Sequence, residues 1–161
     1  MELSTKYAAS QVEAKWYQCW EDAGLFQAQS GTDKPSYTIT IPPPNITGSL
    51  HMGHSLCYPI QDLIGRYKRL RGYNVVIIPG QDHAGIATQS VVSKQLKQQG
   101  IQPAEIGREA FVEKVWQWRK ISGDTIIQQF RLLGCGFDWS KSRFTLDDEY
   151  VNAVLTVFIE W

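Results

Sequence analysis

The sequence predicts an α/β fold in which parallel strands are joined by crossover helices, as in the first half of a doubly wound nucleotide-binding domain. Two segments with the composition of strands, 37–41 and 75–78, are separated by a stretch with helical periodicity. Prolines, glycines and two histidines follow the first strand, where open α/β sheets bind their ligands. Strand, helix and strand in this order form one βαβ unit.

The composition indicates a folded domain. The chain has 161 residues, of which 43% are hydrophobic and 20% charged, which excludes a disordered chain. Sixteen Lys and Arg balance sixteen Asp and Glu, so there is no global positive field for sequence-independent nucleic-acid binding. No apolar run reaches the roughly 18 residues of a membrane helix, no secretory signal begins the chain, and three separated cysteines do not suggest a disulfide framework. We therefore expect a soluble, cytoplasmic protein with no membrane partner.

The first elements follow from periodicity and from turn residues. Apolar residues at helical spacing predict a helix over about 10–23, which Gly24 ends, and a loop follows at 31–34. Residues 37–41 alternate and are β-branched, and three prolines end this strand. The crossover helix that follows closes at Gly72 and contains Pro59, which should kink its axis. One face of this helix is apolar and consists of Leu56, Ile60, Leu63, Ile64, Tyr67 and Leu70.

Three further helices are predicted after the short, fully apolar strand 75–78. The first covers about 88–98, and the second runs from about 103 to 133 with a possible break at Gly123. The last opens with Thr145-Leu146-Asp147-Asp148, which resembles a capping box with Asp in place of Glu. It reaches Trp161 without a Gly, a Pro or a basic last turn, and two strands alone leave the apolar helix faces uncovered. We expect an entry helix and loop at 1–34 and, at 35–161, half of a larger domain that is truncated here.

The residues most suggestive of chemistry lie between 42 and 54. No Asp, Glu, Lys or Arg occurs from 35 to 61, which is typical of a segment that meets charge on a ligand. His51 and His54 are three residues apart at a helix N-terminus, whose unpaired N–H groups suit phosphate. Gly53 between them leaves room for a flat ring against the backbone. Two imidazoles aimed at a phosphate can donate hydrogen bonds to charge that develops in a transition state.

Simpler interpretations of these histidines remain open. Either one alone could be an ordinary polar residue that satisfies a local hydrogen bond. A zinc site of His51, His54 and Cys57 would need a distant fourth ligand, for which His83, Cys19 and Cys135 are the candidates. Because the spacing of these residues is not that of zinc sites, we expect no bound metal.

Four segments together resemble one known family. Residues 42–54, Pro-Pro-Pro-Asn-Ile-Thr-Gly-Ser-Leu-His-Met-Gly-His, resemble the first signature of the class I aminoacyl-tRNA synthetases, in the form found in valyl-tRNA synthetases. Residues 80–89, 136–145 and 12–17 are similar to further segments of that family, in the same order and at family spacing. Isoleucyl and leucyl relatives share the histidines but differ around the prolines and at 80–89. The resemblance implies the N-terminal half of a Rossmann-like catalytic domain.

The resemblance also implies a reaction and its residues. The family activates valine with ATP to valyl-adenylate and transfers valine to tRNA(Val). The catalytic residues would be His51 and His54, which stabilise the α-phosphate while the valine carboxylate attacks, together with Thr47. Gly53 would lie under adenine. The ATP-binding residues would be Pro44, Asn45, Ile46, Thr47, Gly48, Ser49, Leu50, His51, Met52, Gly53 and His54.

The amino-acid site would combine two strand ends. Asp82 would bind the valine ammonium group, although a turn or helix N-cap role is an equal alternative. Pro42 and Pro43 would form an apolar wall against the isopropyl group, beside Asn45. Gln81, beside the ammonium site, departs from the family pattern, in which many relatives carry Thr. Among the departures Pro59 bears most on the site, because a kink there would shift both histidines.

Other expectations concern partners and what the chain lacks. ATP would bring Mg²⁺ with it, tRNA(Val) would bind mainly through parts absent here, and the full-length enzyme would be monomeric. The lysine-bearing second signature does not occur in these residues, so the isolated chain should be a weak or inactive ligase. The basic cluster 66–71 could contact tRNA or simply suit the helix dipole. Alternatives are a non-catalytic ATP- or partner-binding paralogue, an isoleucyl- or leucyl-type synthetase fragment, and a small nucleotidyltransferase.

Overall fold

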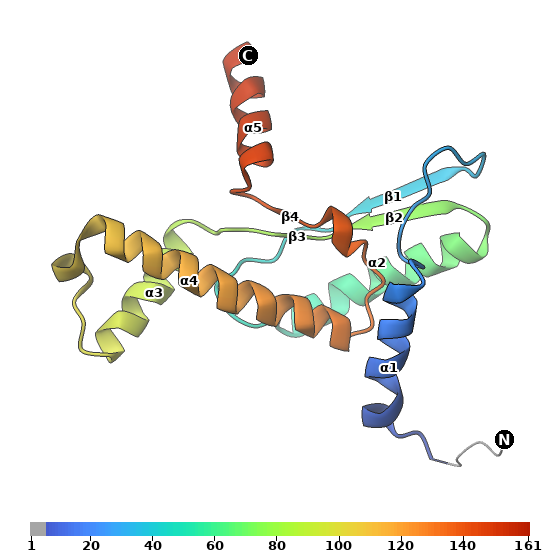
Figure 1. Ribbon diagram of the computed structural model, residues 1–161, viewed down its shortest axis with the longest axis horizontal. Helices are drawn as coiled ribbons and strands as arrows, with labels where there is room; N and C mark the ends of the chain where they lie inside the picture. Colours follow the sequence, from blue (N-terminus) through green and yellow to red (C-terminus); the bar gives the residue numbers. More distant parts are fainter. Residues whose placement is uncertain (1–5) are drawn as a thin grey trace.

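The computed structural model describes residues 6–161 and confirms the predicted βαβ unit (Figure 1). Strand β1, Ser36–Thr40, pairs in parallel with β2, Asn74–Ile78, so that Ser36 lies opposite Asn74 and Thr40 opposite Ile78. Helix α2, Met52–Leu70, is the crossover between them. Val75 and Ile77 of β2 are buried, as expected of an apolar strand inside a parallel sheet.

Residues 138–145 pair along the edge of residues 74–82 that faces away from β1, and we call them the third strand line. We did not predict this pairing. After Pro79 the chain continues as β3, Gly80–Gln81, which pairs in parallel with β4, Arg143–Phe144. Backbone hydrogen bonds from Asp138 N to Ile77 O (3.0 Å) and from Thr145 N to Gln81 O (3.1 Å) extend this pairing. Residues 74–82 are therefore flanked by 36–46 on one edge and by 138–145 on the other.

Two helices connect residues 74–82 with the third strand line. Helix α3, Ile86–Gln98, is followed by the long helix α4, Pro103–Leu132, which runs from the α3 end of the molecule toward α1 (Figure 1). The predicted break of this long helix at Gly123 is wrong, because the non-helical residue is Gly107, at φ 77° and ψ 168°. Gly123 instead allows close packing, since a Cβ there would lie 2.8 Å from Oε1 of Gln81.

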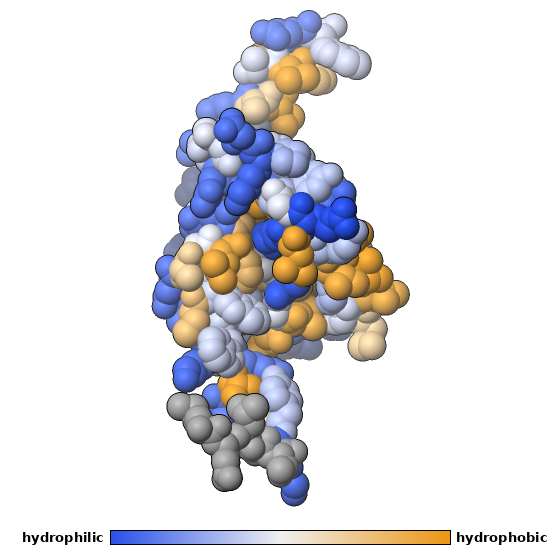
Figure 2. Space-filling view, turned by 90° about the vertical axis from the view of Figure 1, so that its right-hand side faces the viewer, coloured by the Kyte–Doolittle hydropathy of each residue, from blue (hydrophilic) through white to orange (hydrophobic). Residues whose placement is uncertain are grey.

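The two terminal helices cover little of the sheet. Helix α1, Ala9–Asp22, ends at Gly24, whose φ of +63° is the left-handed conformation expected of a C-terminal glycine. Helix α5, Asp148–Glu160, has no buried residue and stands away from the other elements (Figure 1). Hydrophobic atoms are visible on it at the top of Figure 2.

The predicted capping box at the start of α5 is wrong. Asp147 is the N-cap residue, but its carboxylate accepts a hydrogen bond from Phe144 N (2.7 Å) and none from the helix. The Thr145 hydroxyl contacts His83 instead. Thr145, the first residue of the predicted box, and Asp147 thus hold the end of β4 in place, and Asp148 lies in the first turn of α5.

The hydrophobic core lies between β2, α2, α4 and the segment that leads into β4. Its buried members are Ile41, Ile46, Tyr58, Val75, Ile77, Ile126, Phe130, Cys135, Phe137 and Phe144. The rings of Tyr58 and Phe130 meet edge to face with their centroids 4.7 Å apart, a favoured geometry for aromatic pairs. Burial raises the pKa of the Cys135 thiol to about 12, so that this cysteine behaves as an apolar core residue.

Helix α2 turns a polar face inward and its apolar face outward. Its buried residues are Tyr58, Asp62 and Gly65, whereas the predicted apolar face is between 40% and 88% exposed. Gly65 allows close contact with β2, because a Cβ at this position would lie 2.5 Å from Cδ1 of Ile77. The helix continues on both sides of Pro59. Its contact with the sheet therefore depends on small and polar side chains.

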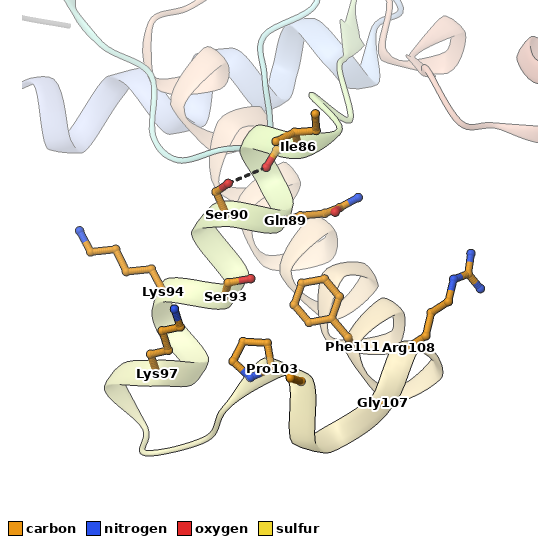
Figure 3. A pocket seen from close by; sticks show the side chains of 11 residues that line it. Ile86, Gln89, Ser90, Ser93, Lys94, Lys97, Pro103, Gly107, Arg108 and Phe111 are labelled. Atoms are coloured by element: carbon orange, nitrogen blue, oxygen red, sulfur yellow. Dashed lines mark hydrogen bonds between the residues drawn. The ribbon is translucent and has the colours of Figure 1, made fainter.

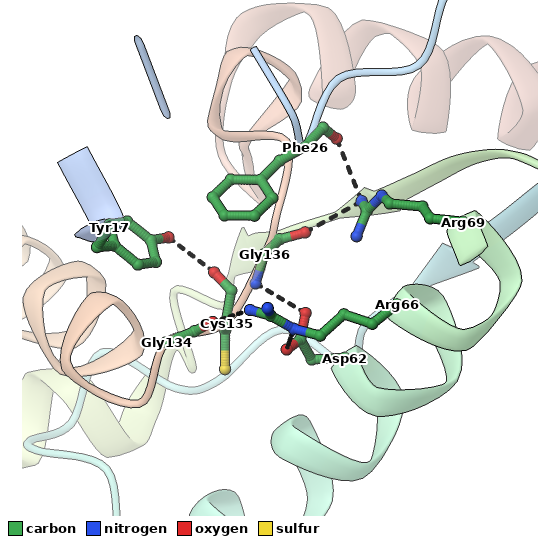
Figure 4. Close-up of polar contacts among 8 residues, drawn as sticks. All are labelled: Tyr17, Phe26, Asp62, Arg66, Arg69, Gly134, Cys135 and Gly136. Carbon is green, nitrogen blue, oxygen red and sulfur yellow. Dashed lines mark hydrogen bonds and ion pairs between the residues drawn. The ribbon is translucent and has the colours of Figure 1, made fainter. Parts of the chain in front are cut away.

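An ion-pair network explains this inverted arrangement (Figure 4). Asp62 accepts hydrogen bonds from Gly136 N (2.8 Å) and from Arg66 Nε (2.6 Å), and Arg66 also donates to Gly134 O (2.5 Å). Arg69 donates to Gly136 O (3.3 Å). Burial lowers the pKa of Arg69. Two arginines of the basic cluster therefore hold the segment between α4 and β4.

No helix within residues 6–161 is long and apolar enough to cross a membrane.

We predict that Asp62→Ala lowers the free energy of unfolding by about 2–3 kcal/mol, because it leaves Gly136 N–H and the Arg66 guanidinium without their shared acceptor. Equilibrium unfolding in urea measures this loss. The control is Asp22→Ala, which removes an exposed carboxylate that accepts a hydrogen bond from the neighbouring Gln18 side chain and should change stability by less than about 0.5 kcal/mol. Equal losses in the two variants would show that the network adds no stability.

Candidate active site

The loop from β1 to α2 lines a cleft of about 470 Å³ at the carboxyl end of β1. Nine residues predicted to bind ATP or the amino acid line it, together with two others from the same segment. The lining residues are Pro42, Pro43, Pro44, Asn45, Thr47, Gly48, Ser49, His51, His54, Cys57 and Tyr58. No Asp, Glu, Lys or Arg occurs in the segment 35–61 that contains them.

Four of the predicted ATP-binding residues lie elsewhere. The Ile46 side chain is in the core and 1% exposed, and Leu50 packs against that core. Met52 points into solvent and is 83% exposed. Gly53 does not line the cleft but lies against His51, where a Cβ would be 3.0 Å from the ring. The side chains of Ile46 and Leu50 thus serve the core, and a role of these two residues in ATP binding stays a prediction.

Both histidines cap the N-terminus of α2. His51 is the N-cap residue, and its Nδ1 accepts a hydrogen bond from Gly53 N (3.1 Å). In return, Nδ1 of His54 accepts from His51 N (3.1 Å). The two rings are stacked, with centroids 3.8 Å apart and an interplanar angle of 24°. The predicted pair is therefore brought together, and the geometry is that of a capping box made from two imidazoles.

Tyr58 continues this stack and is a site residue that we did not predict. Its ring lies 5.6 Å from that of His54, and its hydroxyl donates to Pro42 O (2.7 Å). Burial raises the pKa of Tyr58 to about 12, which keeps the hydroxyl protonated as a donor. The same helix that positions the histidines thus also fixes the first residue of the proline segment. Its spacing of four residues from His54 was the available signal.

Helix α4 holds the loop at two further points. Trp118 Nε1 donates to Ile46 O (2.7 Å), and Gln129 Oε1 accepts from Leu50 N (2.7 Å). No local pattern indicates either contact, because each joins positions more than 70 residues apart.

The two strand ends predicted to bind the amino acid lie side by side. Asn45 and Asp82 form an isolated parallel bridge, with hydrogen bonds from Ile46 N to Asp82 O (3.0 Å) and from Asp82 N to Pro44 O (2.9 Å). Asp82 does not line the cleft of the histidines but borders it through Asn45. Pairing therefore resumes directly beyond the proline segment.

The Asp82 carboxylate has both a turn role and a vacant oxygen. Its Oδ1 accepts from Ala84 N (2.8 Å) and from the Thr145 hydroxyl (3.5 Å). Within the described chain Oδ2 has no hydrogen-bond partner, and the side chain is 39% exposed. The turn interpretation is thus correct for one oxygen, and the other is available to a cationic ligand.

The side chains on either side of Asp82, those of His83 and Gln81, point in different directions. His83 contacts Thr145 through both its backbone N (2.9 Å) and its Nδ1 (2.5 Å), which links the ends of β3 and β4. Gln81 points away from the site and donates from Nε2 to Gly123 O (2.8 Å). The unusual residue at position 81 therefore packs against α4 and points away from the predicted ammonium site.

A second cleft, of about 730 Å³, lies between α3 and the start of α4 (Figure 3). Its cationic side chains do not converge, because Lys94 and Arg108 extend away from each other in this view. It shares no residue with the strand ends. Across residues 6–161, three or more His, Cys, Asp or Glu side chains do not come together as a metal site would require.

Comparison with known proteins finds valine–tRNA ligases among the similar sequences. The chain is 51% identical over 158 residues to a protein described as valine–tRNA ligase of Geobacter sulfurreducens, a match that covers 98% of this chain and 18% of the relative. It is also 51% identical over 156 residues to the valine–tRNA ligase of Nocardia farcinica (97% of this chain, 18% of the relative). The chain thus spans less than a fifth of the length of these relatives.

A solved structure supports the same fold at low sequence identity. The ternary complex of Agrobacterium radiobacter K84 agnB2 LeuRS with tRNA and LeuAMS superposes with a TM-score of 0.77 at 22% identity, covering 96% of this chain and 18% of that chain. The family model described as tRNA synthetases class I (I, L, M and V) matches residues 15–161. With this match along nearly all of its length, the chain belongs to the class I tRNA synthetase family.

Proposed function

We propose that this chain is the N-terminal part of the catalytic domain of a valine–tRNA ligase, which activates valine with ATP and transfers it to tRNA(Val). The observation that supports this most strongly is the neutral cleft with two stacked imidazoles at the carboxyl end of β1, beside the unpaired Asp82 oxygen. The identity of about half to valine–tRNA ligases over nearly the whole chain supports valine as the substrate. Such an enzyme would act as a monomer in the cytoplasm.

The ATP phosphates would bind at the start of α2. His51 and His54 would donate hydrogen bonds to the α-phosphate, and Thr47 and Asn45 would shape the loop around it. The valine carboxylate is already a nucleophile, so no general base is needed. Catalysis would rest on positioning and on stabilising charge that develops on the phosphate. Any Mg²⁺ would arrive with ATP.

Valine would bind between the strand ends. Its ammonium group would meet Oδ2 of Asp82, which has no partner within residues 6–161. Pro42 and Pro43 line the adjacent cleft and would contact the isopropyl group.

We further propose that residues 1–34 contain an entry helix and loop, and that residues 35–161 form the first half of the catalytic domain.

The first test is valine-dependent exchange of labelled pyrophosphate into ATP by the longer polypeptide that carries this chain. We expect exchange with valine and not with isoleucine or leucine. His54→Ala should lower the rate by about 10²–10³, because a donor to the developing charge is lost. Exchange with isoleucine or leucine instead would assign the other substrate. ATP binding without any exchange would identify a non-catalytic protein.

We predict that Asp82→Asn raises the KM for valine by about 10- to 100-fold, because a hydrogen bond to a charged group contributes roughly 1.5–3 kcal/mol. Asparagine keeps the carbonyl oxygen that accepts from Ala84 N, so the turn is preserved. The KM for ATP should not change. Asp148→Asn, on exposed α5, is the matched control. A lower thermal stability with an unchanged KM for valine would assign Asp82 to the turn alone.

A further inference from the structure

The capping geometry of α2 specifies which nitrogen of each site histidine bears its proton. A backbone N–H can donate only to a nitrogen that has a free lone pair. Nδ1 of His51 receives Gly53 N–H and Nδ1 of His54 receives His51 N–H, both at 3.1 Å. In a neutral imidazole the single proton is then on Nε2. Each ring therefore has a fixed acceptor edge toward the helix and a fixed donor on the other nitrogen.

The surroundings also disfavour a second proton on the rings. A proton on Nδ1 would replace the lone pair that caps the helix, and a cation would face the positive end of the helix dipole. Two cationic rings would also repel at a centroid distance of 3.8 Å. The pKa of His54 is lowered, first by burial and then by His51.

Within residues 6–161 no acidic side chain contacts either ring, and Asp82 borders the cleft only through Asn45. The titratable groups that line the cleft are His51, His54, Cys57 and Tyr58, all of them on or at the start of α2. The opposite wall, from Pro42 to Ser49, has no titratable side chain. From α4, Gln129 and Phe130 pack nearby and are uncharged. The pair is thus in a neutral environment.

We infer that both site histidines act as neutral Nε2–H donors, and that the backbone N–H groups of His51 and Gly53 are the positioning groups that fix this tautomer. The phosphate then meets two directed dipoles rather than a positive charge. This inference rests on the proposed function only for the identity of the ligand. The tautomers themselves are a property of the free chain.

The direct test is nitrogen-15 NMR of the histidine rings in the labelled chain at pH 7.5, without ligand. We expect the proton of His51 and of His54 on Nε2, with His83 as an internal reference because its Nδ1 faces the Thr145 hydroxyl instead of a backbone donor. A proton on Nδ1 of either ring, or a doubly protonated ring, would overturn the inference. Identical, averaged nitrogen-15 shifts for all three histidines would also overturn the inference.

A matched pair of variants separates the backbone donor from crowding. Gly53→Pro removes the N–H that His51 accepts, at a position in the first helical turn where proline is tolerated. Gly53→Ala adds a Cβ in the same place but keeps the N–H. In the proline variant we expect His51 to populate the Nδ1–H tautomer while His54 keeps Nε2–H. In the alanine variant both should keep Nε2–H. No difference between the variants would show that the N–H does not set the tautomer.

The pH dependence provides a second readout in the longer polypeptide. Because the pKa of His54 is lowered, the unfolded chain binds its proton at higher pH than the folded chain, so stability is full above the ordinary value of 6.5 and is lost as the pH falls below it. Exchange activity should fall over the same range. His54→Asn does not titrate and keeps an acceptor for His51 N–H, so the ratio of wild-type to variant rate corrects for titration of the substrates. A ratio that rises toward acid pH would show that a cationic ring is the active form.

Discussion

The parallel pairing of residues 36–46 with residues 74–82 positions every part of the candidate site. Ladder pairing holds from Ser36 to Thr40 and resumes at Asn45 opposite Asp82. Between them lie three prolines, which have no N–H to donate and so cannot continue the ladder. The chain leaves the sheet edge at this gap, and the cleft lies where it does so. A covalent property of proline therefore determines where the ligand groups gather.

The second constraint is the close packing of the crossover helix α2 against the sheet and against the segment that leads into β4. Gly65 brings α2 close to Ile77, and Asp62 with its two arginines ties the helix to the segment that leads into β4. This segment then forms the third strand line, from which Thr145 reaches Asp82. The charged network and the amino-acid side of the site are thus linked through one short stretch of backbone. Burying the polar face leaves the apolar residues of α2 exposed.

Local patterns in the sequence predicted the elements that have strong periodicity. The βαβ unit, the first helix and the proline–histidine loop could be found because alternation, helical spacing and proline each act within a few residues. Strand β4 could not, since Arg143 and Phe144 alone show no period. The face of α2 that turns inward was also beyond prediction, because a buried Asp62 depends on partners about 70 residues away. At the site, the histidine pair and the Asn45–Asp82 neighbourhood were predicted, whereas the contacts of Trp118 and Gln129 required the tertiary structure.

The two contacts that α4 makes with the loop have a consequence for how this region can change in evolution. Trp118 and Gln129 are about three helical turns apart and so face the same side of the helix, where one holds Ile46 and the other Leu50. Inserting or deleting a single residue between them would rotate one contact by about 100° away from the loop. The length of α4 between these residues is therefore fixed by the loop. The part of the helix before Trp118, which is already interrupted at Gly107, is free of that restriction and can vary in length.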